Sequence, residues 1–414
     1  MAGGAIDLRP PRRTMPRIAG HKFSLPSAVE SAKARRMTET IAPGLLPEGL
    51  ADRLPPQAEA STRLVREVLD TVARHGYRRV MPALAEFEET LVARLQSAKA
   101  EDLCRAVDPA SQRTLAIRPD MTAQVGRIAA TRLASASRPL RLCYGGPVLK
   151  LRADQLRPER ERMQVGAEII GSDSVAAAVE IVNVAIEALQ RAGVQGITID
   201  FTLPDLVPAL AAGPMPIAPA QVEELRARLD AKDAGAIAAM GAGAAPYQAL
   251  IEATGPFHPA MTRLEAIDAG PAGGALAERI AGLRAIAKPI GWDITLTLDP
   301  TERHGFEYQS WFGFSIFAEG FIGEIGRGGS YTVAQSDGGN EPAMGFSLYP
   351  DPLIDAGFGE ETGKRLFLPL GHDGDRAAAL REQGWITIAA LSDHDEAGAL
   401  GCEAVLNGQD VTPV

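Results

Sequence analysis

The sequence has few cysteines and no apolar run long enough to cross a membrane. Its three cysteines, Cys104, Cys143 and Cys402, are widely spaced among 414 residues and fit neither a disulfide framework nor a zinc site. A reducing compartment such as the cytoplasm is therefore expected. The N-terminus has no apolar signal core, so neither secretion nor membrane insertion is predicted. No motif indicates a metal or a cofactor.

The sequence also lacks an excess of positive charge. It has 42 Lys and Arg residues against 52 Asp and Glu residues, which gives a formal net charge of −10. Because nucleic-acid binding needs clustered cations, this balance argues against a broad nucleic-acid surface, although a local patch is compatible with it. The 46% of hydrophobic and 23% of charged residues are typical of a globular protein. A chain of this length predicts two or three domains.

Residues 1–36 are rich in Arg and Pro and have no apolar periodicity. This composition predicts a disordered leader, and a basic binding arm is the alternative. Periodic sequence begins only after Met37. We therefore expect translation to start at Met37.

Apolar periodicity predicts the main elements of the following segment. Residues 57–75 read as an amphipathic helix that ends at Gly76. Residues 77–87 read as an extended segment, and Pro82 within it indicates an edge or an interface. Strands at 140–151 and 162–171 are expected to pair in an antiparallel hairpin with a long polar loop.

The remainder predicts an α+β fold. A helix at 173–191 and a strand at 196–201 precede a helical insertion at about 205–288 that is rich in Ala, Gly and Pro. Further strands are predicted at 293–298, within 313–333 and at 343–350. We expect an antiparallel sheet bracketed by helices over residues 37–356. A small α/β unit with the order strand, loop, helix, strand is predicted at 364–414.

The segment "IRPDMTAQVGRIAATRL", residues 117–133, raises the question of function. On its own it reads as a turn that starts a helix. Pro119 fixes φ, and Asp120 or Thr122 can cap the first amides of the helix. A substrate-binding corner is the alternative reading.

Taken in order, these pieces resemble the catalytic core of class II aminoacyl-tRNA synthetases, and histidyl-tRNA synthetases most closely. The stretch from the first helix to Pro82 is similar to the first motif, which builds the dimer interface in that family. "RPDMTA" stands where histidyl enzymes have Arg-Pro-Glu-Gly-Thr, and "YGGPVLK" with "RERMQVGAE" is similar to the second motif. "GRGGSY", 326–331, resembles the segment that closes the histidine pocket. The resemblance covers about residues 40–355.

The resemblance implies a histidine pocket. Asp120 and Thr122 would meet the ammonium or the imidazole, Gln164 and Glu168 would point inward, and Tyr331 would lie over the ring. The remaining positions implied by the resemblance are Arg160, Arg303 and Tyr308. An amino acid needs such acceptors in a mostly dry pocket, and Gln164 and Glu168 share a strand face because they lie four residues apart. The alternatives are a solvated strand face for Glu168 and core packing for Tyr331.

The ATP-handling positions of the synthetases are altered. The second-motif arginine is replaced by Lys150, which lacks the planar fork that holds a phosphate. The third motif reads "GFSLYPDPL" and carries no cation. In "RHGFEYQSWFG", 303–313, either Arg303 or His304 takes the arginine position of the histidyl family. Adenylation is therefore not expected.

The tail departs from the histidyl synthetases as well. Residues after 364 are too few for their anticodon-binding domain, so no tRNA partner is expected. The stretch "LPLGHDGD" offers amides to an anion, but a helix cap at Asp373 or Asp375 is the preferred interpretation.

A synthetase fold without this machinery resembles the regulatory subunits of ATP phosphoribosyltransferase, a family of histidyl-synthetase paralogues. "APGLLPEGL", residues 160–171 and "LREQGW" are similar to features of that family. The resemblance implies a non-catalytic homodimer that joins short catalytic subunits in the first step of L-histidine biosynthesis, with histidine as an effector. A divergent histidyl-tRNA synthetase and a stand-alone histidine sensor are the alternatives.

Overall fold

The computed structural model describes residues 44–92, 103–151, 158–268, 274–303, 310–335, 338–360 and 363–414. The predicted leader, residues 1–36, lies outside them. Gly49–Val414 form one compact unit, which contains all the helices and strands described below. Within the described residues, no helix is both long enough and apolar enough to cross a membrane.

The core of this unit is a nine-stranded sheet in the order β1-β5-β6-β12-β11-β10-β7-β9-β8. Its strands are β1 (Arg78–Arg79), β5 (Leu140–Leu149), β6 (Glu161–Ile170), β12 (Asn340–Leu348), β11 (Gly326–Ala334), β10 (Gly313–Ala318), β7 (Ile197–Thr202), β9 (Thr295–Leu298) and β8 (Gly255–Pro256). The pairing is antiparallel except for β1 with β5 and β7 with β9. The α+β prediction is confirmed. The sheet differs from the predicted antiparallel sheet by its two parallel strand pairs near the edges.

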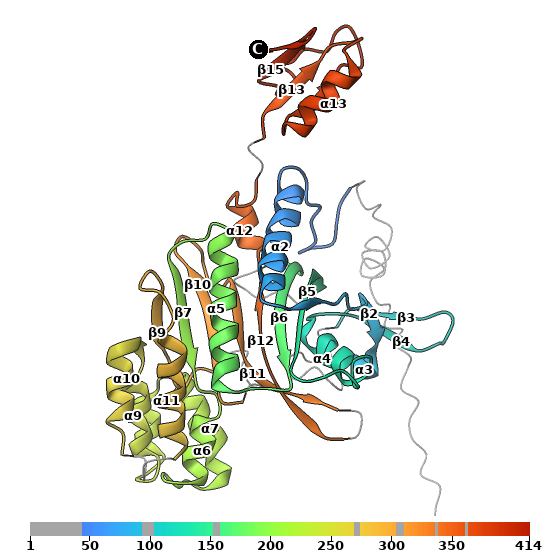
Figure 1. Ribbon diagram of the computed structural model, residues 1–414. Helices are drawn as coiled ribbons and strands as arrows, with labels where there is room; N and C mark the ends of the chain where they lie inside the picture. Colours follow the sequence, from blue (N-terminus) through green and yellow to red (C-terminus); the bar gives the residue numbers. More distant parts are fainter. Residues whose placement is uncertain are drawn as a thin grey trace, which may run out of the picture. The chain divides into compact units, whose positions relative to one another are not determined.

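Two long helices cover one face of the sheet. α2 (Gln57–Arg74) and α5 (Val175–Arg191) bury apolar side chains against Val165, Ala167 and Ile169 of β6. Figure 1 shows both helices lying along the strands. α2 ends before Gly76, whose φ of +85° is easily reached only by glycine. Both helices were predicted from periodicity and are confirmed.

The opposite face of the sheet carries α4 (Thr122–Ala130). Its Val125 and Ala129 pack against Tyr144 and Tyr331 of the sheet in a second core cluster. Next to it lie α3 (Glu88–Val92) and a small sheet of β2 (Ala85–Phe87), β4 (Thr114–Ile117) and β3 (Arg105–Val107). Because side chains alternate along a strand, this face differs in composition from the helix-covered one.

The segment predicted as one extended stretch at 77–87 is divided. Its first part, β1, pairs with β5 in the large sheet, whereas β2 belongs to the small sheet. Pro82 lies between them, and its carbonyl accepts a hydrogen bond of 2.8 Å from Nη1 of Arg118. Since proline cannot donate to a sheet ladder, the chain leaves the large sheet here.

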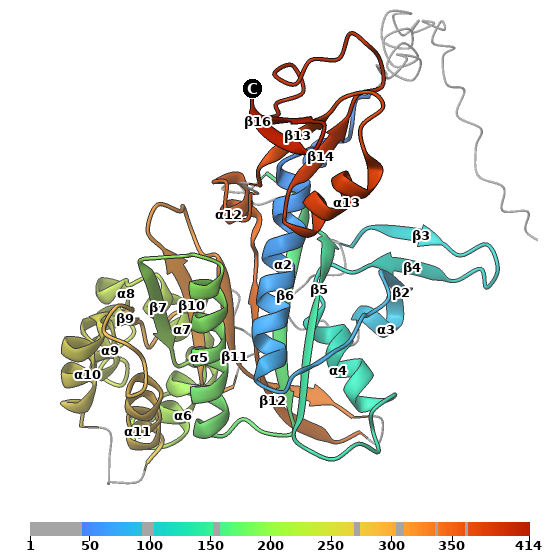
Figure 2. The ribbon, with the colours of Figure 1, turned by 45° about the horizontal axis from the view of Figure 1, so that its top comes forward.

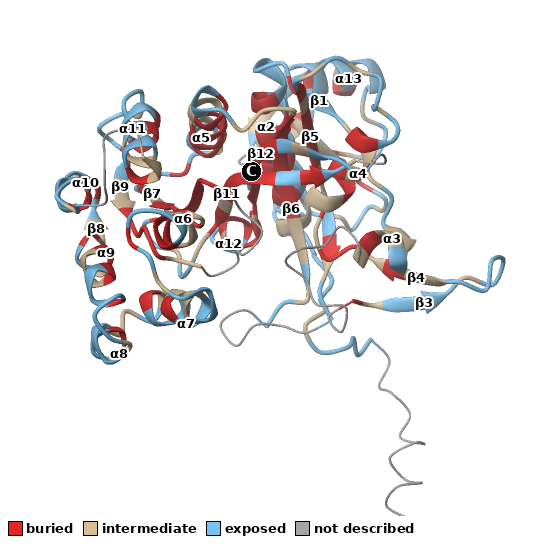
Figure 3. Cartoon of the chain, turned by 90° about the horizontal axis from the view of Figure 1, so that it is seen from below, coloured by how far each residue is buried: buried red, intermediate tan, exposed pale blue. Residues whose placement is uncertain are grey.

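The segment between β7 and β9 is largely helical, as predicted. It contains α6 (Leu206–Ala212), α7 (Pro219–Asp230), α8 (Ala234–Ala239), η2 (Ala245–Tyr247), α9 (Gln248–Glu252), α10 (Phe257–Glu265) and α11 (Ala275–Ala287). Within it α7 and α8 are separate helices, because Lys232 has a φ of +55° between them. Figure 2 shows these helices gathered around β7 and β9, and Figure 3 shows that the outer sides of α8 and α10 are exposed.

The core ends with α12 (Asp351–Asp355), and the C-terminal residues form a separate four-stranded sheet. Its elements are β13 (Arg365–Leu368), α13 (Gly374–Glu382), β14 (Ile386–Ala389), β15 (Ala404–Asn407) and β16 (Asp410–Pro413). The predicted strand, helix and strand are present. The hairpin β15–β16 was not predicted, because its short strands have little alternation.

The N-cap of α13 is Asp373, one of the two residues, Asp373 and Asp375, that the sequence offered. Its carboxylate accepts hydrogen bonds from the amides of Asp375 and Arg376 at 2.9 and 3.1 Å. Replacing Asp373 by alanine should speed hydrogen exchange in the first turn of α13 on the order of fivefold, because these amides lose their acceptor. Asp375→Ala is the matched control. Equal exchange in the two variants would contradict the assignment.

Candidate functional site

A pocket opens on the α4 face of the large sheet, with a cavity volume of about 30 Å³. Strand register explains which side chains face it. Glu168 of β6 pairs with Leu142 on one side and Gly345 on the other, and Gly345 pairs with Gly329 of β11. Paired residues point to the same face of a sheet. The pocket lining is Asp120, Thr122, Glu168, Arg327, Gly328, Gly329, Tyr331, Gly345, Phe346, Ser347 and Tyr349.

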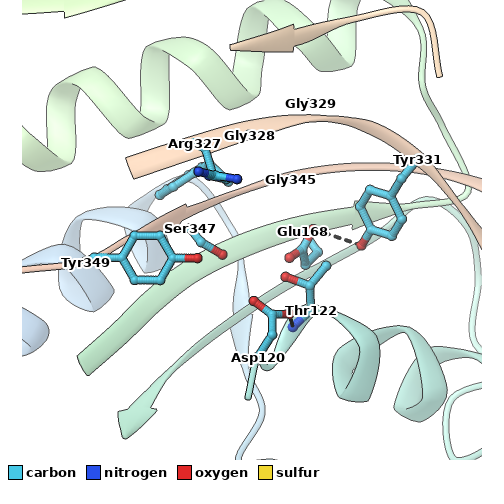
Figure 4. A pocket seen from close by; sticks show the side chains of 11 residues that line it. Asp120, Thr122, Glu168, Arg327, Gly328, Gly329, Tyr331, Gly345, Ser347 and Tyr349 are labelled. Atoms are coloured by element: carbon cyan, nitrogen blue, oxygen red, sulfur yellow. Dashed lines mark hydrogen bonds between the residues drawn. The ribbon is translucent and has the colours of Figure 1, made fainter. Parts of the chain in front are cut away.

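Glu168 is the most deeply buried acid in this lining, with 1% of its surface exposed. The hydroxyl of Tyr144 donates to its Oε1 and the hydroxyl of Tyr331 donates to its Oε2, both at 2.9 Å. Figure 4 shows Asp120, Thr122 and Tyr331 gathered around it. Burial raises the pKa of Glu168 to about 8, and the nearby Asp120 adds to this, although the two tyrosine hydroxyls oppose it. The carboxyl is therefore largely protonated near neutral pH.

Asp120 is positioned by Gln164, which lies behind the pocket wall and is fully buried. Nε2 of Gln164 donates to Oδ2 of Asp120 at 2.7 Å and to the hydroxyl of Ser347 at 2.8 Å. Oε1 of Gln164 accepts from the Met121 amide at 2.9 Å. The side chain is thus fully satisfied, and it acts through Asp120.

In the turn at 118–122, the two carboxylate oxygens of Asp120 have different partners. Oδ1 of Asp120 accepts from the Thr122 amide at 2.7 Å, so it satisfies the first amide of α4 as predicted, although the N-cap residue is Met121. The other oxygen is held by Gln164 at the pocket. Arg118 anchors the turn by donating from Nε to the Pro147 carbonyl at 2.8 Å, and only 6% of it is exposed. The capping and the binding-corner readings are compatible, because they use different oxygens.

Glycines keep the pocket open. A Cβ on Gly345 would overlap the Glu168 carboxylate, and a Cβ on Gly166 would lie 2.7 Å from the Tyr144 hydroxyl oxygen. These strands tolerate no side chain at the two positions without moving the buried acid or its partner.

The structure brings together five of the eight residues predicted for the site. Asp120, Thr122, Glu168 and Tyr331 line the pocket, and Gln164 supports it. Tyr308 lies outside the described residues.

Arg160 and Arg303 are not placed at the pocket. The Arg160 amide donates to the Gly49 carbonyl at 2.8 Å, ahead of β6 and about 13 Å along the strand from Gln164. Arg303 forms an ion pair with Glu223 at 3.1 Å, and its amide donates to Asp230 at 3.0 Å. The helix α7 thus holds Arg303 within the insertion.

Four residues at this site were not assigned from the sequence: Tyr144, Arg327, Ser347 and Tyr349. Tyr144 and Ser347 both pair with Gly166 across the sheet, so they flank the same position. Arg327 lies in the quoted "GRGGSY" segment. Alternation within each strand was visible in the sequence, but the register between strands was not.

The segment corresponding to the third synthetase motif carries a buried carboxylate. Asp351 is 7% exposed, forms an ion pair with Arg53 and accepts from the Met163 amide. Burial raises the pKa of Asp351, and the charge of Arg53 counteracts this. This segment thus presents an ion-paired carboxylate where synthetases of this class have an arginine.

The geometry can be compared with known proteins. A family model described as "Histidyl-tRNA synthetase" matches residues 49–353. An ATP phosphoribosyltransferase regulatory subunit from Paramagnetospirillum magneticum is 45% identical, over 86% of this chain and 93% of its own length. The protein with the same description from Rhodospirillum centenum is 44% identical, over 84% of this chain and 89% of its own length.

Solved structures show the same fold. An ATP phosphoribosyltransferase regulatory subunit/histidyl-tRNA synthetase from Bacillus halodurans matches with a TM-score of 0.75 at 20% identity, covering 89% of this chain and 98% of that one. A histidyl-tRNA synthetase from a Nostoc species matches with a TM-score of 0.67 at 14% identity, over 87% and 90% of the two chains. With its class II synthetase fold and its extensive identity to these relatives, the chain belongs to the family of ATP phosphoribosyltransferase regulatory subunits, which are regulatory rather than catalytic.

Proposed function

We propose that this chain forms a homodimer in the cytoplasm and assembles with short catalytic subunits of ATP phosphoribosyltransferase. In this complex it activates the catalytic subunit, which performs the first step of L-histidine biosynthesis, and it contributes to feedback by histidine. It requires no cofactor of its own and no tRNA. The names of the relatives support the partner, and the pocket supports the effector.

The observation that carries the effector proposal is the meeting of two acidic groups in a small buried pocket. Asp120 and Glu168 face the same space, and Arg327 of the lining forms an ion pair with Glu324. The acids suit the ammonium of a free amino acid, and its carboxylate would compete with Glu324 for Arg327. The ring of Tyr331 offers an apolar surface to an imidazole. The cavity volume of about 30 Å³ holds a water-sized group, so histidine binding requires the lining side chains to move apart.

Feedback also requires that histidine binds one state of the complex more tightly than another. Only such differential affinity shifts a population between active and inactive states.

The direct test is to add the purified chain to the short catalytic subunit and to measure phosphoribosyl transfer to ATP. We expect activity to rise in proportion to complex formation and to fall when histidine is added. Unchanged activity at saturating amounts of the chain would reject the proposal. Robust histidine-dependent ATP–pyrophosphate exchange by the chain alone would instead identify a synthetase.

The histidine site is tested by Glu168→Ala and Tyr331→Ala in the assembled complex. Inhibition by histidine should weaken at least tenfold in both, because each variant removes one side chain of the hydrogen-bonded pair Glu168–Tyr331. Glu187→Ala is the control, since Glu187 is a partly exposed acid paired with His75. Calorimetry with histidine on the isolated chain, wild type against Asp120→Ala, measures the pocket directly. Unchanged inhibition in both pocket variants would place the inhibitory site elsewhere.

A further inference from the structure

A second and larger cavity, of about 800 Å³, lies in the helical insertion between α10 and the connection from α11 to β9. We refer to it as the α10 groove. Its floor is apolar and is formed by Phe257, Met261, Ile294 and Leu296. The first three are buried, so the groove is part of the packed structure and not a gap between loose segments.

The rim of the α10 groove carries an unusual residue, Trp292. It is 98% exposed, whereas most other large apolar side chains of this region are buried. A fully exposed tryptophan adds a large apolar surface to water at a free-energy cost, and tryptophan is enriched among the residues that dominate protein interfaces. A partner protein can pack against Trp292 and place an apolar side chain on the floor beside it.

The floor of the groove includes an incompletely paired strand. β9 spans Thr295–Leu298, but its outer neighbour β8 pairs only with Thr297 and Leu298. Among the described residues, Thr295 and Leu296 have a strand partner on the β7 side only. Figure 1 shows β9 near the end of the sheet, beside α10 and α11. An open strand edge is suited to an extended segment of another protein.

The charge at the groove differs from that of the chain as a whole. Arg284 is neutralised by an ion pair with Glu265, and Lys288 is the remaining charged residue of the lining. The lining therefore carries one net positive charge, although the chain carries a net charge of −10. Charge complementarity favours an acidic partner segment, and it would steer that segment to this site.

We propose that the α10 groove is the docking site of the catalytic subunit, which inserts an extended segment with a carboxylate and a large apolar side chain. This inference rests on the proposed function, because it names the same partner. The apolar side chain lies on the floor against Met261 and packs with Trp292, and the carboxylate meets Lys288. The histidine pocket lies on another part of the sheet, lined by different residues, so docking leaves it accessible.

The test measures the dissociation constant of the full chain and the short catalytic subunit by analytical ultracentrifugation. Trp292→Ala should weaken assembly at least tenfold, because the anchor is lost. Lys288→Glu should weaken it about fivefold or more at low salt, and this difference should shrink at high salt. Both side chains are exposed, so thermal unfolding should be unchanged.

Two controls carry matched changes away from the groove. Ile322→Ala removes another apolar side chain that is 87% exposed, and Arg381→Glu reverses an exposed charge in the C-terminal unit. Both should assemble as the wild type does. If wild-type chains assemble and the two groove variants assemble equally well, the docking proposal is wrong and the proposed function stands. If the wild type does not assemble, the proposed function fails and the docking proposal fails with it.

Discussion

The wild type is expected to lose stability as the pH rises from about 4.5 to about 8, and replacing Glu168 by glutamine should remove this loss. The group ionises near pH 4.5 when unfolded, but burial holds its pKa at about 8 in the folded protein. Between these values the folded state binds one proton more than the unfolded state. Its free energy of unfolding therefore falls by about 1.4 kcal/mol per pH unit.

Glutamine does not titrate, so this slope should be absent from the variant. The measurement is urea unfolding of both proteins at several pH values, with the difference in unfolding free energy plotted against pH. Glu180→Gln is a control of opposite sign. Hydrogen bonds from Arg141 lower the pKa of Glu180 in the folded protein. The stability that Glu180 contributes to the fold is therefore present above its unfolded pKa and is lost as the pH falls. Parallel curves for wild type and Glu168→Gln would show that the buried acid has an ordinary pKa.

The same proton links stability to ligand binding. A ligand ammonium placed beside Glu168 favours the ionised form, so binding near neutral pH should release a proton from this carboxyl. Calorimetry in buffers with different ionisation enthalpies counts that proton. Release by the wild type and none by Glu168→Gln would assign the proton to Glu168. The burial that destabilises the empty pocket at high pH thus makes the pocket selective for a cationic group.

The sequence predicted those parts of the fold in which local pattern and tertiary packing agree. α2, α5 and the β5–β6 hairpin have long apolar periods, and each packs its apolar side against the same core. The segment at 77–87 has no such period. Its division between two sheets depends on Pro82 and on the carbonyl contact from Arg118, which joins residues 36 positions apart.

The site was predictable to a similar extent. Alternation placed Gln164 and Glu168 on one face, and the structure agrees. Alternation did not reveal that Gln164 lies behind the wall, because that position depends on its contacts with Ser347 and Asp120 from other elements. Likewise, Arg303 follows β9 in sequence, but an ion pair with α7 of the insertion determines its place. The pattern of a single sequence encodes neither the register between distant strands nor the contacts of an inserted segment.

Gly345→Ala is expected to be the most damaging small substitution in the pocket. The added Cβ would overlap the Glu168 carboxylate and lie 2.6 Å from the Ala167 carbonyl oxygen in the neighbouring strand. Neither group has free space, since Glu168 is held by Tyr144 and Tyr331. Such overpacking costs roughly 1–3 kcal/mol, and any shift of Glu168 should also abolish histidine binding. Urea unfolding and calorimetry measure the two effects.

Gly235→Ala is the matched control, because its Cβ would meet only ordinary contacts on α8, where alanine favours the helix. It should leave stability unchanged or slightly raised. The cause of the damage is tested by adding Glu168→Ala to Gly345→Ala. Removing the overlapped carboxylate should recover part of the lost stability, so the double variant should be more stable than the sum of the single effects predicts. Strict additivity would mean that the backbone contact alone accounts for the loss. In that case Gly345 serves the spacing of β12 against β6, and the open space beside Glu168 follows from that spacing.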